Sequence, residues 1–144
     1  MAERTKRRAA LVTGAASGIG KATALAFAQA GYAVLAADVQ DREGEAVAAR
    51  IRDGGGEAFF VGCDVAEEAD IECAVAQCAA RFGRLDAAFN NAGIEGEQAV
   101  TADCSNENWE RVIAVNLRGV WQCMKHQIPA MLAGGGGAIV NCSS

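Results

Sequence analysis

The sequence predicts an α/β protein built on a doubly wound parallel sheet. Short apolar runs alternate with longer segments of helical periodicity along the whole chain. The apolar runs show no polar alternation, which is typical of strands buried on both faces of a parallel sheet. Right-handed crossovers between such strands give the strand order 3-2-1-4-5. The order reverses between the first and fourth strands, and ligands of such sheets bind there, at the carboxyl ends of the strands.

The first half of the chain is expected to alternate three strands with two helices. The strands are short runs of alanine, valine, leucine and phenylalanine, and the helices repeat alanine at helical spacing. Both helices end at glycine, a residue that commonly follows the last helical turn. In chain order, the expected elements are the strand Ala9–Val12, the helix Lys21–Ala30, the strand Ala33–Ala37, the helix Arg42–Arg52 and the strand Ala58–Val61.

The second half continues the alternation. Gly83 ends the third helix, and the run Gly134–Gly137 ends the fourth. A loop from Ile94 to Ser105 separates the fourth strand from a long final helix. The expected elements are the helix Glu67–Phe82, the strand Leu85–Phe89, the helix Asn106–Leu132 and the strand Ala138–Cys142.

The composition is that of one globular domain over residues 1–144. Apolar residues make up 51% of the chain and charged residues 22%, as in ordinary soluble proteins. A net charge of −5 argues against a nucleic-acid partner, because polyanion binders need basic patches. No segment resembles a signal peptide or is long and apolar enough to cross a membrane. We therefore expect no membrane contact and a cytoplasmic location.

Six cysteines raise the question of a metal or disulfide framework. None of them forms a C-x-x-C pair, and the only histidine, His126, has no ligand-like cluster around it in the sequence. In a reducing cytosol such cysteines act as small hydrophobic residues. No metal site is expected.

A glycine-rich turn follows the first strand. Gly14, Gly18 and Gly20 have the spacing G-x-x-x-G-x-G and lead directly into a helix. Glycines allow a tight turn and a close approach of the backbone to a pyrophosphate, and the helix N-terminus favours negative charge. A tight turn without a ligand would look the same. The turn's position between a strand and a helix favours a Rossmann-type dinucleotide site.

An acidic residue follows the second strand. Asp38 lies 18 residues after Gly20. A carboxylate at this place accepts hydrogen bonds from the adenosine ribose and repels a 2′-phosphate, although it could instead only cap the next helix. An NADP site would need a basic residue in the glycine turn or after this strand, and Arg42 is the only nearby cation. The cofactor expected is therefore NAD rather than NADP.

Five motifs resemble those of short-chain dehydrogenases/reductases, and together they span the chain. They are Thr13–Gly20, matching T-G-x-x-x-G-x-G, then Asp64-Val65, Asn90-Asn91-Ala92-Gly93, Val115-Asn116-Leu117 and Ile139–Ser144. The resemblance implies a nicotinamide cofactor. The residues expected to bind it are Gly14, Ser17, Gly18, Ile19, Gly20, Asp38, Asp64, Val65, Asn91, Ala92 and Gly93.

The resemblance also implies a mechanism for oxidising an alcohol or reducing a ketone. In the family a tyrosine exchanges the substrate proton, and a lysine four residues later lowers the pKa of that tyrosine. A serine binds the substrate oxygen and an asparagine supports a water that relays protons. By position these are Ser144 and Asn116. A serine at a strand end can instead only satisfy a loop, and an asparagine within a helix can bond to the backbone.

The family's Tyr-x-x-x-Lys motif does not occur in these residues. The only tyrosine is Tyr32, and Ala36 stands four positions later. We therefore expect an N-terminal portion that stops after the fifth strand, is inactive alone and forms a homo-oligomer when full length. The alternatives are a non-catalytic dinucleotide-binding module and a methyltransferase on the same sheet. Asn90–Gly93 and Asn116 argue against the methyltransferase.

Overall fold

A five-stranded parallel sheet forms the centre of the protein, as the computed structural model describes it for residues 7–143. The strand order is β3-β2-β1-β4-β5, which confirms the predicted topology. The strands are β1 (Ala9–Thr13), β2 (Ala33–Asp38), β3 (Ala58–Gly62), β4 (Ala87–Asn90) and β5 (Ala138–Asn141). The helices are α1 (Gly18–Gln29), α2 (Asp41–Asp53), α3 (Glu68–Phe82), α4 (Asn106–Ile113) and α5 (Gly119–Ala133).

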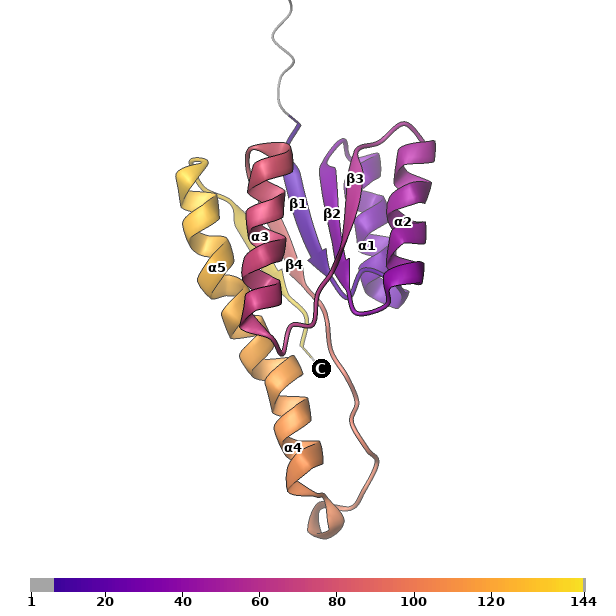
Figure 1. Ribbon diagram of the computed structural model, residues 1–144, viewed down its shortest axis with the longest axis vertical. Coiled ribbons are helices and arrows are strands. Elements are labelled where there is room, and N and C mark those ends of the chain that lie inside the picture. The colour runs from indigo at the N-terminus through magenta and orange to yellow at the C-terminus, as the bar shows by residue number, and fades with distance from the viewer. Residues whose placement is uncertain (1–6, 144) are drawn as a thin grey trace, which may run out of the picture.

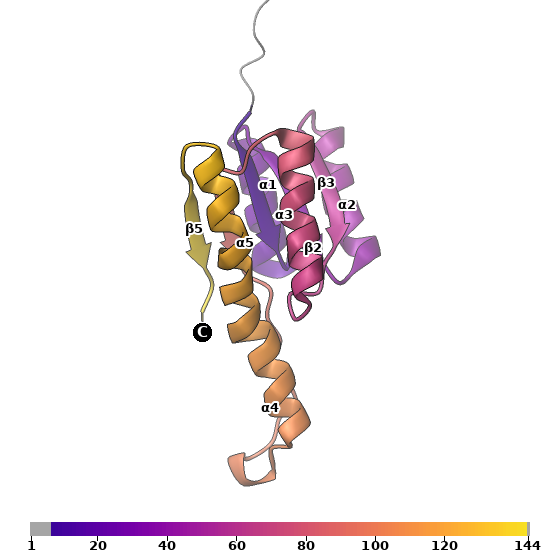
Figure 2. The same cartoon turned by 60° about the vertical axis from the view of Figure 1, so that its left-hand side comes forward.

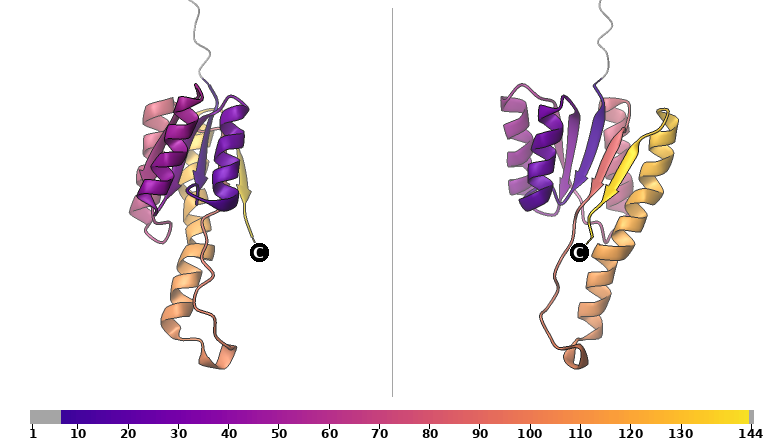
Figure 3. Two further views of the ribbon diagram at one scale, coloured as in Figure 1. Left: turned by 90° about the vertical axis from the view of Figure 1, so that its right-hand side faces the viewer. Right: turned by 180° about the vertical axis from the view of Figure 1, so that it is seen from behind.

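The sheet separates two apolar cores. The central strands β1 and β2 are buried along their whole length, because helices cover both faces. Alternate residues of β1 point to opposite sides, so Leu11 joins the core under α3 and α5 and Val12 joins the core under α1 and α2. In Figure 2, α3 and α5 lie in front of the strands and α1 lies behind them. Figure 3 shows β5 at one edge of the sheet.

Two element boundaries differ from the expected ones by more than one residue. Helix α1 begins at Gly18 rather than Lys21, so the last two glycines of the turn already belong to the helix. Strand β4 begins at Ala87 rather than Leu85. The reason is Asp86, whose carboxylate accepts a hydrogen bond from the Ala9 N–H at 2.7 Å and pairs with Arg84. A polar anchor therefore precedes the strand.

The long C-terminal helix is not one regular α-helix as expected. Between α4 and α5 the segment Ala114–Arg118 is a π-helix. Single π turns within α-helices often occur at functional sites. This one carries Asn116, an exposed residue whose side chain bonds to the backbone of Ile94. Figure 1 shows α4 and the loop before it extending together from the body of the molecule.

Candidate cofactor-binding site

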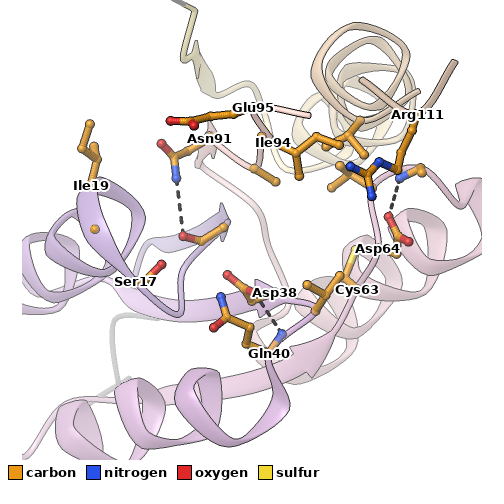
Figure 4. A pocket seen from close by; sticks show the side chains of 18 residues that line it. Ser17, Ile19, Asp38, Gln40, Cys63, Asp64, Asn91, Ile94, Glu95 and Arg111 are labelled. Atoms are coloured by element: carbon orange, nitrogen blue, oxygen red, sulfur yellow. Dashed lines mark hydrogen bonds between the residues drawn. The ribbon is translucent and has the colours of Figure 1, made fainter. Parts of the chain in front are cut away.

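A cavity of about 850 Å³ lies at the carboxyl ends of the strands, beside the glycine turn. It occupies the crevice that the strand order predicts, between β1 and β4, where the direction of the strand order reverses. Figure 4 shows side chains from both halves around it. The lining residues are Gly14, Ser17, Gly18, Ile19, Asp38, Val39, Gln40, Cys63, Asp64, Val65, Ala66, Asn91, Ala92, Gly93, Ile94, Glu95, Arg111 and Val115.

The glycine turn has a shape that only glycine permits. Gly14 and Gly18 have φ angles of 64° and 54°, in the left-handed region that other residues rarely adopt. A Cβ on Gly20 would lie 2.0 Å from the carbonyl oxygen of Gly14, so the first turn of α1 rests directly on the backbone of the loop. The free N–H groups at the start of α1 therefore lie beside the cavity, where an anion is favoured.

A threonine joins the glycine turn to the end of β4. The Thr13 hydroxyl oxygen accepts hydrogen bonds from the N–H groups of Asn91 at 3.0 Å and Ala92 at 3.1 Å. In return, the Asn91 amide donates to the carbonyl oxygens of Thr13 and Gly14, both at 3.4 Å. Two segments 77 residues apart thus form one wall of the cavity.

Asp38 closes the opposite side of the turn. Its carboxylate accepts hydrogen bonds from the N–H groups of Ala16 and Gln40, each at 3.0 Å, and the residue is 7% exposed. The bond to Ala16 ties the end of β2 to the glycine turn. Each carboxylate oxygen retains a lone pair, so Asp38 can still accept hydrogen bonds from hydroxyl groups in the cavity.

The third wall comes from the turn after β3. The Asp64 carboxylate accepts a hydrogen bond from the Ala66 N–H at 2.9 Å, which fixes the turn, and Val65 is buried next to it. Cys63 lies at the base of this wall. Burial, with smaller effects from neighbouring acidic groups, raises the pKa of its thiol to about 12. The thiol is therefore uncharged at neutral pH and serves as an apolar lining group.

The structure brings most of the predicted site residues together. Every residue expected at the cofactor lines the cavity except Gly20, which supports the turn from below. Asn116 does not line it. Its amide pairs with both backbone groups of Ile94 at 2.8 Å, which is the backbone-bonding alternative considered for it. Ser144 lies outside the described residues.

Several residues of the site are not predicted from the sequence. Thr13 belongs to the glycine motif, and its hydroxyl forms the link to β4. Helix α4, the π-helical segment Ala114–Arg118 and α5 together form one helical rod. Arg111 and Val115 reach the cavity from this rod, with Arg111 directed toward Asp64 in Figure 4. Their spacing of four residues on one helix face could have grouped them. Their contact with the cavity, however, depends on where the rod crosses the sheet.

This chain belongs to the short-chain dehydrogenase family, whose sequence pattern matches residues 8–144. Among solved structures, it is similar to a 3-ketoacyl-ACP reductase from Sinorhizobium meliloti 1021, with a TM-score of 0.92 and 43% identity. That match covers 94% of this chain and 53% of the other. A levodione reductase structure matches with a TM-score of 0.91 and 37% identity, over 95% of this chain and 54% of the other.

Relatives of known activity are similar over the whole chain. A cyclohexanol dehydrogenase from an Acinetobacter species is 45% identical, and a cis-4-hydroxycyclohexanecarboxylate dehydrogenase from Sinomonas cyclohexanicum is 44% identical. Each match covers all of this chain and 57% of the relative. The chain therefore spans little more than half the length of these relatives.

Within residues 7–143, histidine, cysteine, aspartate and glutamate side chains nowhere gather in groups of three or more that could hold a metal ion. In the same part of the chain, no helix has the length and apolar character that a membrane crossing requires.

Proposed function

We propose that the cavity binds NAD and that the chain supplies the cofactor-binding part of an oxidoreductase for an alcohol or ketone substrate. The observation that carries the proposal is the fit of the glycine turn to a pyrophosphate. Gly14 and Gly18 line the cavity with backbone alone, and Gly20 lets the first turn of α1 rest on the loop. A bound nicotinamide dinucleotide supplies the hydride acceptor or donor of the reaction.

The walls of the cavity suit the parts of a dinucleotide. Amide groups at the start of α1 would hold the pyrophosphate, and the Asp38 carboxylate would accept hydrogen bonds from ribose hydroxyls. Asp64 and Val65 form the wall proposed for the adenine. Asn91, Ala92 and Gly93 form the wall at the end of β4, and we assign them to the nicotinamide half.

The electrostatics favour NAD over NADP. Asp38 is the charged group at the end of β2, and its two backbone hydrogen bonds hold the carboxylate in place at the cavity wall. A 2′-phosphate would meet this negative charge. The other members of the lining near the turn, Ser17, Val39 and Gln40, carry no positive charge that would offset it.

The catalytic roles proposed for Asn116 and Ser144 follow the family resemblance. Asn116 holds Ile94 through both of its backbone groups. One amide N–H and one Oδ1 lone pair of Asn116 remain, and with these it would support a water. Ser144 would hydrogen-bond the substrate oxygen. Proton transfer requires a group within hydrogen-bond reach.

Tyr32 cannot supply that group. It precedes β2, at the end of the sheet opposite to the cavity, where its ring packs against Phe27 at a centroid distance of 5.1 Å and under the Arg8 guanidinium. We therefore predict that the purified 144-residue chain shows no appreciable NADH formation with secondary or cyclic alcohols. A steady absorbance increase at the NADH band, dependent on both alcohol and protein, would contradict this prediction.

A non-catalytic dinucleotide-binding module is the second candidate, and the position of Tyr32 is the observation that favours it. Both proposals require that the cavity bind a dinucleotide. Titration calorimetry of the 144-residue chain with NAD, NADP and S-adenosylmethionine tests this requirement. We expect binding of NAD, weaker binding of NADP and none of S-adenosylmethionine. Binding of S-adenosylmethionine alone would overturn the dinucleotide site.

We also propose self-association through the outer face of the helical rod. Trp109, Leu117, Trp121, Ile128 and Leu132 form one exposed apolar row along α4 and α5 at spacings of four, seven and eight residues. A row of this kind is complementary to itself in a twofold dimer. The free cysteines fit a reducing compartment, and we propose the cytoplasm as the location.

A further inference from the structure

A buried chain of side-chain amides joins α5 to the ends of β4 and β5. Gln127 and Asn90 exchange two hydrogen bonds: the Asn90 amide donates to Gln127 Oε1 at 3.0 Å, and the Gln127 amide donates to Asn90 Oδ1 at 2.7 Å. The Asn90 amide also donates to Asn141 Oδ1 at 2.9 Å. Gln127 is 0% exposed and Asn90 is 1% exposed.

The packing of α5 alone does not require this glutamine. Its buried neighbours on the same helix include Cys123 and Met131, which fill the core without polar groups. A buried amide is tolerated only when it is hydrogen-bonded, because its desolvation is otherwise uncompensated. The reciprocal pair meets that condition and, unlike an apolar contact, fixes the orientation of both side chains.

The amide chain ends beside the proposed cofactor site. Asn90 directly precedes Asn91, Ala92 and Gly93, which line the cavity. The Asn90 carbonyl oxygen accepts a hydrogen bond from the Cys142 N–H at 2.9 Å, so β5 stays in register with β4 beyond Asn141. Asn90 therefore joins both strand ends that lead into the site, through its backbone carbonyl to Cys142 and through its side chain to Asn141.

We propose that Gln127 is a positioning residue: through Asn90 and Asn141 it fixes the ends of β4 and β5, and with them the cavity wall Asn91–Gly93. The inference rests on the proposed NAD site for its effect on affinity. Its effect on the strand ends does not depend on any ligand. Gln127 does not line the cavity and acts only through Asn90, which in turn holds Asn141.

The chain provides a matched control. Gln122 lies on the same helix and is also buried, at 8% exposure, but its amide donates to Glu68 on α3, and its Oε1 atom has no hydrogen-bond partner among residues 7–143. Gln127→Leu and Gln122→Leu thus remove the same group from the same helix, and only the first removes it from the amide chain.

Hydrogen exchange of the 144-residue chain measures the strand ends directly. In Gln127→Leu the N–H groups of Asn91, Ala92 and Cys142 should exchange about tenfold faster, as expected for the loss of one buried hydrogen-bond pair. The Ala15 N–H, which donates to Ala37 on the other side of the sheet, should keep its rate. Gln122→Leu should change neither set. Equal acceleration of both sets would show a merely global effect and overturn the proposal.

Calorimetry with NAD gives the second readout. We expect Gln127→Leu to bind NAD about fivefold or more weakly and Gln122→Leu to bind it as the parent chain does, since a displaced wall loses contacts. A parent chain that binds no NAD would contradict the proposed function, and the exchange experiment would then decide on Gln127 alone. Unchanged NAD affinity in a Gln127→Leu chain that retains binding would overturn the positioning role.

A second variant serves if Gln127→Leu does not fold. Gln127→Glu keeps the size and an acceptor for the Asn90 amide but loses the donor to Asn90 Oδ1 when ionised. It should accelerate exchange at the same three N–H groups. Exchange in this variant that matches the parent chain at all three would contradict the proposal.

Discussion

Gly14 and Gly20 meet at the point where the loop after β1 passes under the first turn of α1. The position that a Cβ on Gly20 would occupy lies 2.0 Å from a backbone oxygen, and backbone cannot move aside as a flexible side chain can. The spacing of Gly14 and Gly20 in the sequence therefore reflects a close contact between two backbone segments. Their closeness is what opens the amide groups of α1 to the cavity.

Gly20→Ala should separate those segments. We expect it to lower the free energy of unfolding by about 2 kcal/mol or more, because an inserted methyl group forces a backbone shift, and to weaken NAD binding at least tenfold. Urea unfolding and calorimetry measure both effects. Gly54→Ala is the control, since a Cβ there meets its nearest atoms only at 3.5 Å. Equal behaviour of the two variants would contradict this account of the turn.

Asp38 has a structural role in the glycine turn, and we propose that it also recognises the cofactor. Both carboxylate oxygens bond to backbone N–H groups, so the charge is held at the cavity wall and cannot swing away from a phosphate. Discrimination between cofactors should therefore depend on this one residue.

Asp38→Asn should bring the affinities for NAD and NADP closer together by about tenfold, since one unit of repulsive charge is removed near the ribose. Calorimetry with each cofactor measures the ratio. Asp41→Asn, which removes the same charge at the start of α2 but outside the cavity lining, should leave it unchanged. If the ratio of NAD to NADP affinity shifted equally in both variants, the discrimination would come from the net charge of the region and not from Asp38 at the cavity wall.

At the scale of elements, a polar cluster joins the start of α3 to the middle of α5. The Glu68 carboxylate accepts hydrogen bonds from Lys125 and from His126, the latter at 2.9 Å, while Gln122 donates to its other oxygen. Hydrogen bonds from Lys125 and then His126 lower the pKa of Glu68 below its usual 4.5. The folded chain therefore keeps this carboxylate ionised at lower pH than the unfolded chain does.

The cluster predicts an acid-sensitive contribution to stability. Because the pKa of Glu68 is lower in the folded state, the stabilisation is fully present above 4.5 and is lost as the pH falls through the lowered pKa. Urea unfolding of Glu68→Gln should show a smaller loss of unfolding free energy below that pH than the parent chain. Glu72→Gln, an exposed change one turn further along α3, should follow the parent. A parallel pH dependence in all three would contradict the assignment.

At the scale of the whole molecule, two apolar features remain uncovered in the described chain. One is the row on α4 and α5, in which Trp121 is 55% exposed and Leu117 64% exposed. The other is β5, which pairs only with β4 and exposes 61% of Val140. An unpaired sheet edge and an exposed helix face both favour association.

Sedimentation velocity can distinguish the two surfaces. We expect Trp121→Glu to shift the chain from dimer toward monomer, because it places a charge in the centre of the helical row, and Val140→Lys to leave the dimer intact. The reverse result would place association at the β5 edge. A parent chain that is monomeric at all concentrations would contradict the proposed self-association.

The fold could be predicted from the sequence because the patterns that indicate strands, helices and turns lie within short segments. Buried strands, helix-ending glycines and the reversal between β1 and β4 depend on the polarity and order of short segments, and the observed sheet follows them. Side-chain partners are different. Gln127 and Asn90 are 37 residues apart, and neither residue carries a pattern that points to the other. Their contact exists only because α5 lies across β4.

Asn116 also combines a local signal in the sequence with a side-chain partner that only the tertiary structure reveals. Asparagine has a low helix propensity and is unusual in an apolar helical segment. Whether its side chain supports a water or bonds to backbone depends on where the loop after β4 passes the segment between α4 and α5. The structure places Ile94 against it and lets the rod widen into a π-helix there.

By itself, the sequence determined the strand order, the glycine turn and the acidic residue that faces it, since backbone sterics and charge act within a few residues. Only the tertiary structure decided which side chains hold that turn in place. Thr13 and Asn91 hold it through hydrogen bonds between segments distant in the chain, and such bonds form only where the sheet brings the ends of β1 and β4 together.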